Sequence, residues 1–170
     1  MKLITRRHLL KISTAVAAAA ALPRLASAYQ VSAAAKAALA ESPLVYISPL
    51  KSDGEESRCH GEVWFFADGG DVVICSETTT WKATAQRQGL QQARIWVGDY
   101  GPVWRSLGRY RNAPEFLAQV SVDSDPATHQ RLMADFARRY PEEWPAWEQR
   151  FVEQYAAGTR VILRYRPIGD

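Results

Sequence analysis

The stretch RCHGEVWFFADGGDVVICSETTTWK, residues 58–82, decides the fold, because it contains two strand-like segments joined by a short turn. The tetrapeptide DGGD at residues 68–71 is typical of a tight hairpin turn. The flanking segments, 58–67 and 72–76, are rich in apolar and aromatic residues. We therefore expect an antiparallel β-hairpin with Asp68 facing Asp71.

Alternation along the first strand places Val63 and Phe65 on one face, and Glu62 and Trp64 on the other. The first face is apolar enough to line the interior of a barrel. The second face is mixed, so we expect it to be covered at one end and open to water or to a ligand at the other. In this register Glu62 faces Glu77, a like-charge pair that requires a nearby cation.

The chain has two cysteines, Cys59 and Cys75. The hairpin register places Cys75 opposite Trp64, about 17 Å along the strand from Cys59. A disulfide requires Cα atoms within about 7 Å. The sequence therefore predicts two free thiols, which pack as small hydrophobic groups rather than react.

The N-terminus has the features of an export signal. Paired arginines in TRRHLLK, residues 5–11, precede a short apolar segment at 12–22 and the small-residue pattern ASA at 26–28. The pair resembles the twin-arginine export motif. The apolar segment is shorter than the roughly 20 residues that span a bilayer. We expect cleavage after Ala28, no stable membrane insertion afterwards, and a periplasmic or secreted protein exported by the twin-arginine pathway.

Removing residues 1–28 changes the charge balance. They carry five of the 21 basic residues and no acidic residue, so residues 29–170 carry 16 bases against 18 acids. The basic character of the whole chain therefore belongs to the signal, and we expect no nucleic-acid partner. The length of the remainder suits one domain, residues 29–170.

Other segments alternate between strand and helix patterns. Besides the hairpin, strands are expected at residues 44–48, 93–101, 115–123 and 159–167, and helices at 29–42, 81–90, 126–140 and 144–158. Residues 103–111 are also assigned as extended. The sequence predicts an α+β fold with six strands, a short helix after the third strand, and a two-helix insertion before the last strand.

Common catalytic and metal-binding motifs are missing from the sequence. It contains no Walker phosphate loop, no G-x-G-x-x-G fingerprint, no H-E-x-x-H or C-x-x-C spacing, and no G-x-S-x-G elbow. Beyond the signal, the imidazoles are those of His60 and His129. These absences argue against most hydrolases and metalloenzymes.

The junction between the hairpin and the following helix gathers groups that suit an anion. A helix N-terminus with nearby hydroxyls and cations can hold a phosphate, and a tryptophan can lie against a planar ring. The candidate cofactor-binding residues are Arg58, Ser76, Thr78, Thr79, Thr80, Trp81, Lys82 and Arg87. The alternative, which composition alone favours, is that Thr80 caps the helix, Trp81 packs and Lys82 is solvated.

The order of these motifs, S-R-x-x-x-E-V-W-F-F, D-G-G-D and V-V-I-C-S-E-T-T-T-W-K, resembles the FMN-binding split β-barrel superfamily. This superfamily includes pyridoxamine 5′-phosphate oxidase-like proteins and deazaflavin-dependent nitroreductases. The resemblance spans about residues 39–167 and implies a six-stranded antiparallel split β-barrel. It also implies that Arg58 and Thr80-Trp81-Lys82 bind the cofactor phosphate, although several flavin-binding members have arginine at the position of Trp81.

The resemblance implies an exported oxidoreductase that binds FMN or a deazaflavin as its small-molecule cofactor and forms a homodimer. It identifies no catalytic residue, although His60 and Glu62 lie on the relevant strand. An exported binding module, either haem-binding or cofactor-free, is the alternative. A third hypothesis is a structural protein that dimerises through the aromatic helices. Their aromatic residues, Trp144, Trp147, Phe151 and Tyr155, have the spacing of a core stripe.

Overall fold

The computed structural model describes residues 31–168. The export signal and the cleavage site predicted after Ala28 lie outside the described residues. The described chain begins with helix α1 (Ala33–Glu41), where the Ser32 hydroxyl accepts a hydrogen bond from the Ala35 N–H at 3.1 Å. This side-chain cap satisfies one of the free N–H groups of the first helical turn.

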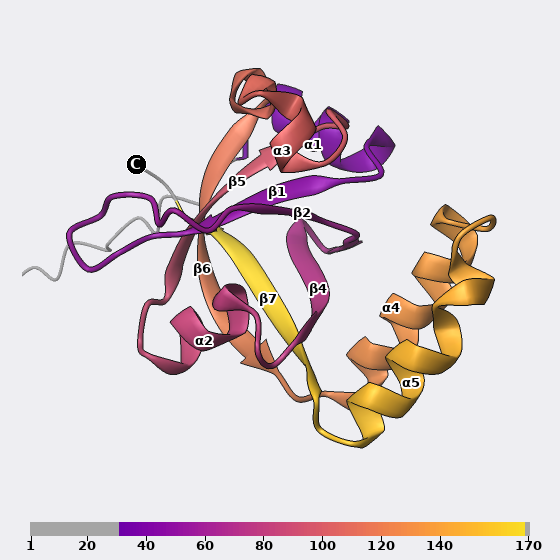
Figure 1. Cartoon of the computed structure of the whole chain (residues 1–170). Coiled ribbons are helices and arrows are strands. Elements are labelled where there is room, and N and C mark those ends of the chain that lie inside the picture. Colours follow the sequence, from indigo (N-terminus) through magenta and orange to yellow (C-terminus); the bar gives the residue numbers. More distant parts are fainter. Residues whose placement is uncertain (1–30, 169–170) are drawn as a thin grey trace, which may run out of the picture.

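Seven antiparallel strands form one sheet in the order β2-β1-β5-β6-β7-β4-β3 (Figure 1). The strands are β1 (Val45–Pro49), β2 (Gly61–Val63), β3 (Phe66–Asp68), β4 (Asp71–Glu77), β5 (Gln92–Val97), β6 (Glu115–Asp123) and β7 (Arg160–Ile168). Strands β2 and β3 lie at opposite edges of this order, yet only Trp64 and Phe65 separate them in the chain. Because two residues cannot span a flat sheet, the sheet curls until its edges meet, as a barrel does.

The helices lie outside the curled sheet (Figure 1). They are α2 (Trp81–Arg87), α3 (Val103–Ser106), α4 (Pro126–Arg139) and α5 (Glu148–Ala156), with 3₁₀ turns η1 (Arg109–Asn112) and η2 (Trp144–Ala146). The predicted helix after the hairpin and the two-helix insertion before the last strand are both confirmed. Helix α4 begins as the sequence indicates, because the Asp125 carboxylate accepts a hydrogen bond from the Ala127 N–H at 2.9 Å.

The predicted hairpin is confirmed at its turn and is wrong beyond it. Asp68 faces Asp71 as expected, and the pairing of β3 with β4 ends at Phe66 and Val73. Residues 58–67 therefore do not form one strand. They contribute β2 to one edge of the sheet and β3 to the other, which is one reason why the sheet has seven strands and not six.

Residues 58–67 divide into β2 and β3 at Trp64 and Phe65, where a side chain of the insertion binds the backbone. The Phe65 N–H donates to the hydroxyl of Tyr140, at the end of α4, at 3.3 Å. The residues before Phe65 do not pair with β4. Glu62 pairs instead with Tyr46 on β1, rather than facing Glu77 as predicted. The like-charge pair that the sequence suggested is therefore not formed.

Residues 103–111 are not the extended segment that the sequence suggested, but helix α3 followed by turn η1. This region covers the outer face of β1, where the ring of Tyr110 stacks on that of Tyr46 at 4.6 Å. The Tyr46 hydroxyl also donates to the Gly101 carbonyl at 2.6 Å and accepts from the Tyr100 N–H at 2.9 Å. Such tertiary contacts override the strand-like composition.

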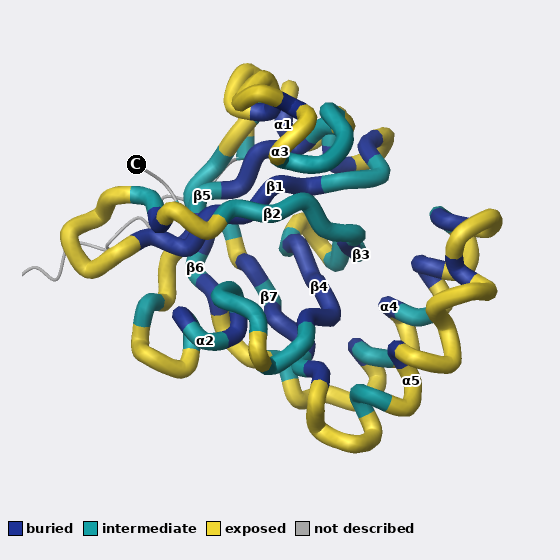
Figure 2. The backbone as a smooth tube through the Cα atoms, viewed as in Figure 1, coloured by how far each residue is buried: buried dark blue, intermediate teal, exposed yellow. Residues whose placement is uncertain are grey.

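Two hydrophobic clusters pack against the sheet, and most of β4 is buried (dark blue in Figure 2). Phe65 and Ile74 lie in the cluster inside the barrel, as the alternation predicted. Cys75 belongs to a second cluster between the sheet and the α4–α5 pair, and Trp64 packs against that cluster. The insertion contributes Leu132, Phe136, Tyr140, Trp144 and Phe151 to that second cluster. The aromatic stripe of the insertion therefore forms core, with one exception described below.

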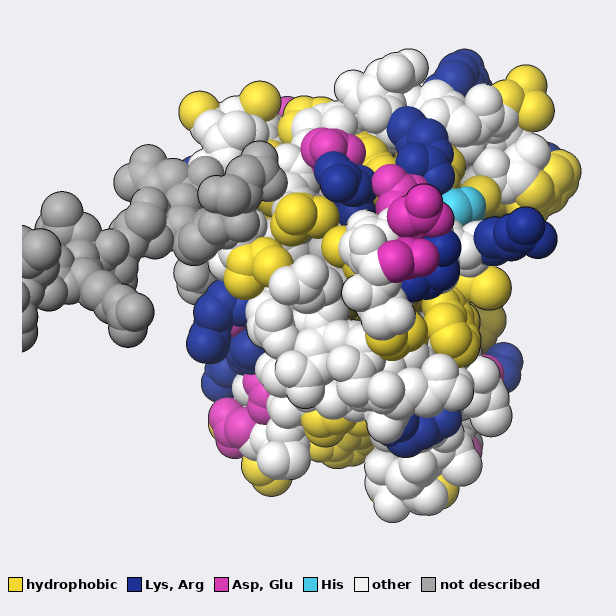
Figure 3. All heavy atoms as spheres, turned by 90° about the vertical axis from the view of Figure 1, so that its left-hand side faces the viewer, with side chains coloured by type: hydrophobic (Ala, Val, Ile, Leu, Met, Phe, Trp, Pro, Cys, Tyr) yellow, Lys and Arg dark blue, Asp and Glu magenta, His cyan; other side chains and the backbone are white. Residues whose placement is uncertain are grey.

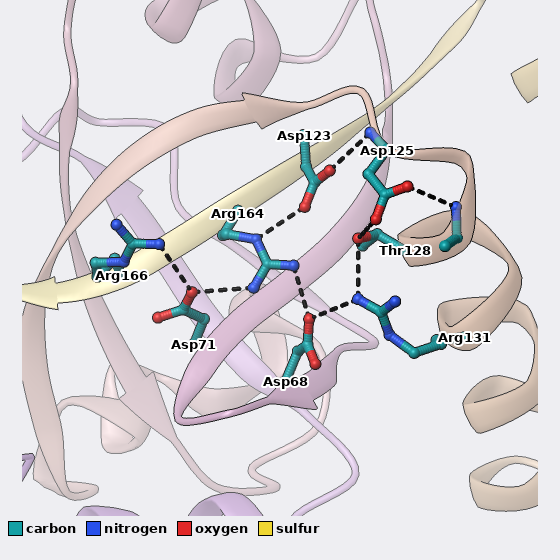
Figure 4. A network of polar contacts seen from close by, with 9 residues as sticks. Asp68, Asp71, Asp123, Asp125, Thr128, Arg131, Arg164 and Arg166 are labelled. Atoms are coloured by element: carbon teal, nitrogen blue, oxygen red, sulfur yellow. Dashed lines mark hydrogen bonds and ion pairs between the residues drawn. The ribbon is translucent and has the colours of Figure 1, made fainter.

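A charged network ties the hairpin turn to the last strand and to α4 (Figure 4). Arg164 on β7 forms ion pairs with Asp68 at 2.7 Å, Asp71 at 3.0 Å and Asp123 at 2.8 Å. Arg131 on α4 reaches Asp68 at 3.1 Å. Two carboxylates of the hairpin turn and one at the end of β6 thus share one guanidinium, which fixes the turn against β6 and β7.

Acidic and basic side chains lie next to one another on the face shown in Figure 3. In the loop before β2, Glu56 forms ion pairs with Arg94 at 3.3 Å and with Arg111 at 2.7 Å. Arg111, one of the basic residues in the segment expected to be extended, is therefore neutralised locally.

Candidate functional site

A cavity of about 480 Å³ lies where β2 separates from β4, next to the α4–α5 pair. One group of its lining residues is polar: Glu62, Ser76, Thr80 and Lys82. Another group is aromatic: Trp64, Phe136, Trp147 and Phe151. The cavity therefore offers both polar and apolar surface to a ligand.

The cavity exists because β4 loses its neighbour on one side. Beyond Val73, no residue of β3 pairs with β4. On the other side, Ser76 and Glu77 remain paired with Val161 and Arg160 of β7. The open edge of β4 is the part of the sheet that the sequence had assigned to a longer hairpin.

Lys82 in the first turn of α2 is the central cation of the polar lining. Its ammonium group lies so close to β2 that a Cβ atom added to Gly61 would be 2.8 Å from Nζ. Burial lowers the pKa of Lys82, and the negative charge of Glu62 opposes this shift. Among residues 31–168, Lys82 has no hydrogen-bonded or ion-paired carboxylate partner.

The other charged groups around the cavity are already held in place. Glu62 accepts a hydrogen bond from the Val103 N–H at 3.0 Å. Glu77 pairs with Arg150 at 3.1 Å and with Arg160 at 3.3 Å. Arg160 also lies over an aromatic ring, and so Glu77 and Arg160 form a closed structural pair rather than a free binding site.

Both cysteines are free, as the sequence predicted. Cys59 is exposed, and Cys75 is buried beside the cavity. Burial raises the pKa of Cys75 to about 11, against a smaller opposing effect of Arg160. The Cys75 thiol therefore stays protonated at neutral pH and does not provide a thiolate.

The hydroxyls of Ser76 and Thr80 line the cavity but already have partners. Thr80 caps α2, where its hydroxyl accepts from the Ala83 N–H at 3.5 Å and donates to the Glu77 carbonyl at 2.9 Å. The Ser76 and Thr80 hydroxyls are 2.8 Å apart. The capping role that composition favoured for Thr80 is confirmed, and both groups are positioned by the strand-to-helix turn.

Three more of the predicted residues do not line the cavity. The Thr78 hydroxyl donates to the Thr159 carbonyl at 3.2 Å, and Thr79 is exposed. Arg87 donates to the Thr78 carbonyl at 2.7 Å and to the Thr84 hydroxyl at 3.1 Å. These contacts hold the turn to the start of β7 and leave Arg87 directed at the protein backbone.

The remaining two predicted residues, Arg58 and Trp81, do not line the cavity either. Arg58 is exposed, whereas Trp81 is partly buried and its indole N–H has no partner among the described residues. The structure thus brings together Ser76, Thr80 and Lys82 from the predicted set. It adds Trp64 and Trp147, which the sequence had marked only as apolar packing residues.

Neither described imidazole lines the cavity. His60 directly precedes β2 and lies beside β1, with its Nδ1 3.4 Å from the Ser48 hydroxyl, and burial followed by the charge of Arg111 lowers its pKa. His129 stacks on Tyr155 at 3.8 Å. Within residues 31–168, no cluster of three His, Cys, Asp or Glu side chains could hold a metal ion.

Comparisons with known proteins agree with this architecture. The haem-storage protein HutZ from Vibrio cholerae matches with a TM-score of 0.53 and 12% identity, over 83% of this chain and 92% of that one. A conserved hypothetical protein from Mycobacterium tuberculosis matches with a TM-score of 0.52 and 16% identity, over 81% of each chain. A candidate pyridoxamine 5′-phosphate oxidase from Listeria innocua matches with a TM-score of 0.51 and 13% identity, over 79% of this chain and 91% of that one.

The chain has the split-barrel fold. At these identities the similarity defines the fold and not the ligand. A family model for the twin-arginine translocation signal sequence matches residues 3–23, which confirms the predicted signal. A search of curated proteins finds no match. None of the helices in the described part of the chain is long and apolar enough to cross a membrane.

Proposed function

We propose that the split-barrel domain binds FMN or a deazaflavin in the cavity beside β4 and acts as an exported oxidoreductase. The observation that carries this proposal is Lys82, a partly buried cation that lines the cavity without a carboxylate partner among the described residues. A buried cation is costly unless an anion accompanies it. A bound phosphate would supply that anion.

The residues present fit such a cofactor in two respects. A volume of about 480 Å³ is in the range of small-molecule sites. Aromatic side chains beside the cation suit a planar ring system, and Lys82 suits its charged tail. The bound cofactor would supply hydride transfer, while the chain supplies binding and orientation.

The twin-arginine signal supports the exported location, which we propose to be the periplasm or the extracellular space. This pathway carries proteins that fold before export, as a protein loaded with its cofactor must. The homodimer that the resemblance implies belongs to the same proposal. Measuring the molar mass by light scattering tests it directly.

An absorption spectrum of protein purified from exporting cells tests the cofactor proposal. We expect flavin or deazaflavin absorption, or uptake of added FMN by colourless protein. Lys82→Met should weaken FMN binding about tenfold or more, because a hydrogen-bonded charge is lost. Arg58→Ala is the matched comparison, since Arg58 is a predicted phosphate ligand that does not line the cavity. Protein that binds neither FMN nor a deazaflavin would disprove the proposal.

Haem binding is the second candidate, favoured by the similarity in fold to the haem-storage protein of Vibrio cholerae. The cavity offers no imidazole to a haem iron, and the thiol of Cys75 is held protonated by burial. We therefore place haem after flavin. A Soret band in the purified protein would reverse this order, and a protein that binds none of these cofactors would leave the cofactor-free binding module.

A further inference from the structure

One aromatic residue of the insertion is not used as core. Among the cavity-lining aromatics of the insertion, Phe136 is 1% exposed and Phe151 is 8% exposed, whereas Trp147, the N-cap of α5, is 40% exposed. Trp147 meets Phe151 edge-on at a centroid distance of 6.5 Å. Its indole therefore adds little to the packing of the helices and leaves apolar ring surface at the cavity.

The chain fixes Trp147 in place at the start of α5. The Trp147 N–H donates to the Trp144 carbonyl at 2.8 Å, and the Trp147 carbonyl accepts from the Phe151 N–H at 3.0 Å. Arg150 lies over the indole at 5.5 Å and is itself paired with Glu77. The helix hydrogen bonds fix the backbone of Trp147, and Arg150 and Phe151 contact its indole, so a ring that binds there has less side-chain freedom to remove.

Two features of the cavity define the class of molecule that would fit it. Lys82 provides a cation, and Trp147 provides an exposed indole on a different structural element. Their combination suits a flat ring that carries a negatively charged group. Trp64, the other tryptophan that lines the cavity, is stacked on Tyr140 at 4.4 Å and packs against the core cluster of the insertion.

We propose that Trp147 is the ring-binding residue of the cavity, so that the α4–α5 insertion selects planar anionic ligands whose charge lies near Lys82. The inference rests on the proposed function for the identity of the ligand, FMN or a deazaflavin. It goes beyond that function in assigning ring recognition to the insertion. Trp147 then determines ring affinity and Lys82 determines the preference for a charged tail.

Titrations with FMN and with riboflavin, which has the same ring without the phosphate, separate the two roles. We expect Trp147→Ala to weaken both ligands by a similar factor, about tenfold, because stacking on the ring is lost. Trp147→Phe should retain part of that affinity. Lys82→Met should weaken the binding of FMN but not of riboflavin, so that the two affinities become similar. Flavin fluorescence and its quenching on binding provide the measurement.

Val152→Ala is the matched control, because Val152 is a 44% exposed apolar residue of α5 that does not line the cavity. It should bind both flavins as the unmodified protein does. Thermal unfolding of each variant establishes that the fold is intact. If Trp147→Ala binds both flavins as Val152→Ala does, the inference is overturned while the proposed function stands.

If the unmodified protein binds no flavin, the proposed function fails and the ligand class is tested with anilinonaphthalene sulfonate. This probe carries aromatic rings and an anionic sulfonate. Weaker binding in both Trp147→Ala and Lys82→Met, with Val152→Ala unchanged, would support the inference. Equal binding in all three variants would overturn it.

Discussion

Two partly buried cations, Arg164 on strand β7 and Lys82 at the start of helix α2, differ in the carboxylate partners that the fold gives them. Arg164 on β7 has three carboxylate partners within 3.0 Å, whereas Lys82, after β4, has none among the described residues. Removing a cation from water is costly, and only a matched set of anions offsets that cost. The comparison separates a cation that completes the fold from a cation that remains available to a ligand.

The pKa shifts of these two residues follow the same difference. Burial by itself would lower the pKa of Arg164, but hydrogen bonds to Asp68, Asp71 and Asp123 raise it above the usual arginine value. Burial also lowers the pKa of Lys82, and the negative charge of Glu62 is the largest effect that opposes it. A shifted lysine in a cavity is a typical mark of a functional site.

The largest expected effect is the loss of the Arg164 network. Arg164→Met leaves three neighbouring carboxylates without their shared partner, and we expect the free energy of unfolding to fall by about 3 kcal/mol. Denaturant titration measures this change. Arg166→Met is the control, because Arg166 is 72% exposed and reaches Asp71 only at 3.7 Å, so its loss should cost under about 0.5 kcal/mol. Equal losses in both variants would contradict the structural role of Arg164.

Acidic pH should remove the stability that the Arg164 ion pairs contribute. The hydrogen bond from Arg164 lowers the pKa of Asp68, and for Asp123 the hydrogen bonds outweigh a burial effect that would raise it. Groups with lowered carboxyl pKa values stabilise the fold above the ordinary value of about 4, and this stability disappears as the pH falls through the lowered pKa. The difference between wild type and Arg164→Met should therefore shrink below about pH 4 in denaturant titrations. A constant difference would show that charge is not the cause.

Lys82→Met should change stability far less, and in the opposite direction. A lowered lysine pKa means that the charged form costs stability at neutral pH, and that this cost disappears as the pH rises through the lowered pKa. We expect Lys82→Met to be as stable as wild type or up to about 1 kcal/mol more stable at neutral pH. A large destabilisation would place Lys82 among the structural cations.

The same cation should make ligand affinity depend on pH. Binding of FMN should weaken as the pH rises through the pKa of Lys82, which lies below the ordinary lysine value, because the cation is lost. Fluorescence titrations across the alkaline range measure it. Lys82→Met should lack this dependence, and an identical pH profile in both proteins would assign the phosphate contact to another residue.

Local sequence patterns predicted the parts of the fold that depend on neighbouring residues. The DGGD turn, the alternation that buries Phe65 and Ile74 inside the barrel, and the Asp125 cap of α4 each follow from a few adjacent residues. The errors arose where distant contacts decide. Residues 103–111 form a helix and a turn over Tyr46, and residues 58–67 divide where Tyr140 holds the backbone of Phe65.

The candidate site shows the same division. The sequence placed Ser76, Thr80 and Lys82 at one strand-to-helix junction, because they are close along the chain. The sequence did not predict that Arg58 lies away from the cavity or that Trp147 lines it. Both positions depend on how β2 and α5 lie against β4. The sequence by itself therefore determined the export signal, the turn and the cation. Only the tertiary structure decided that the barrel opens beside this cation, because strand pairing and helix packing join residues that are far apart in the chain.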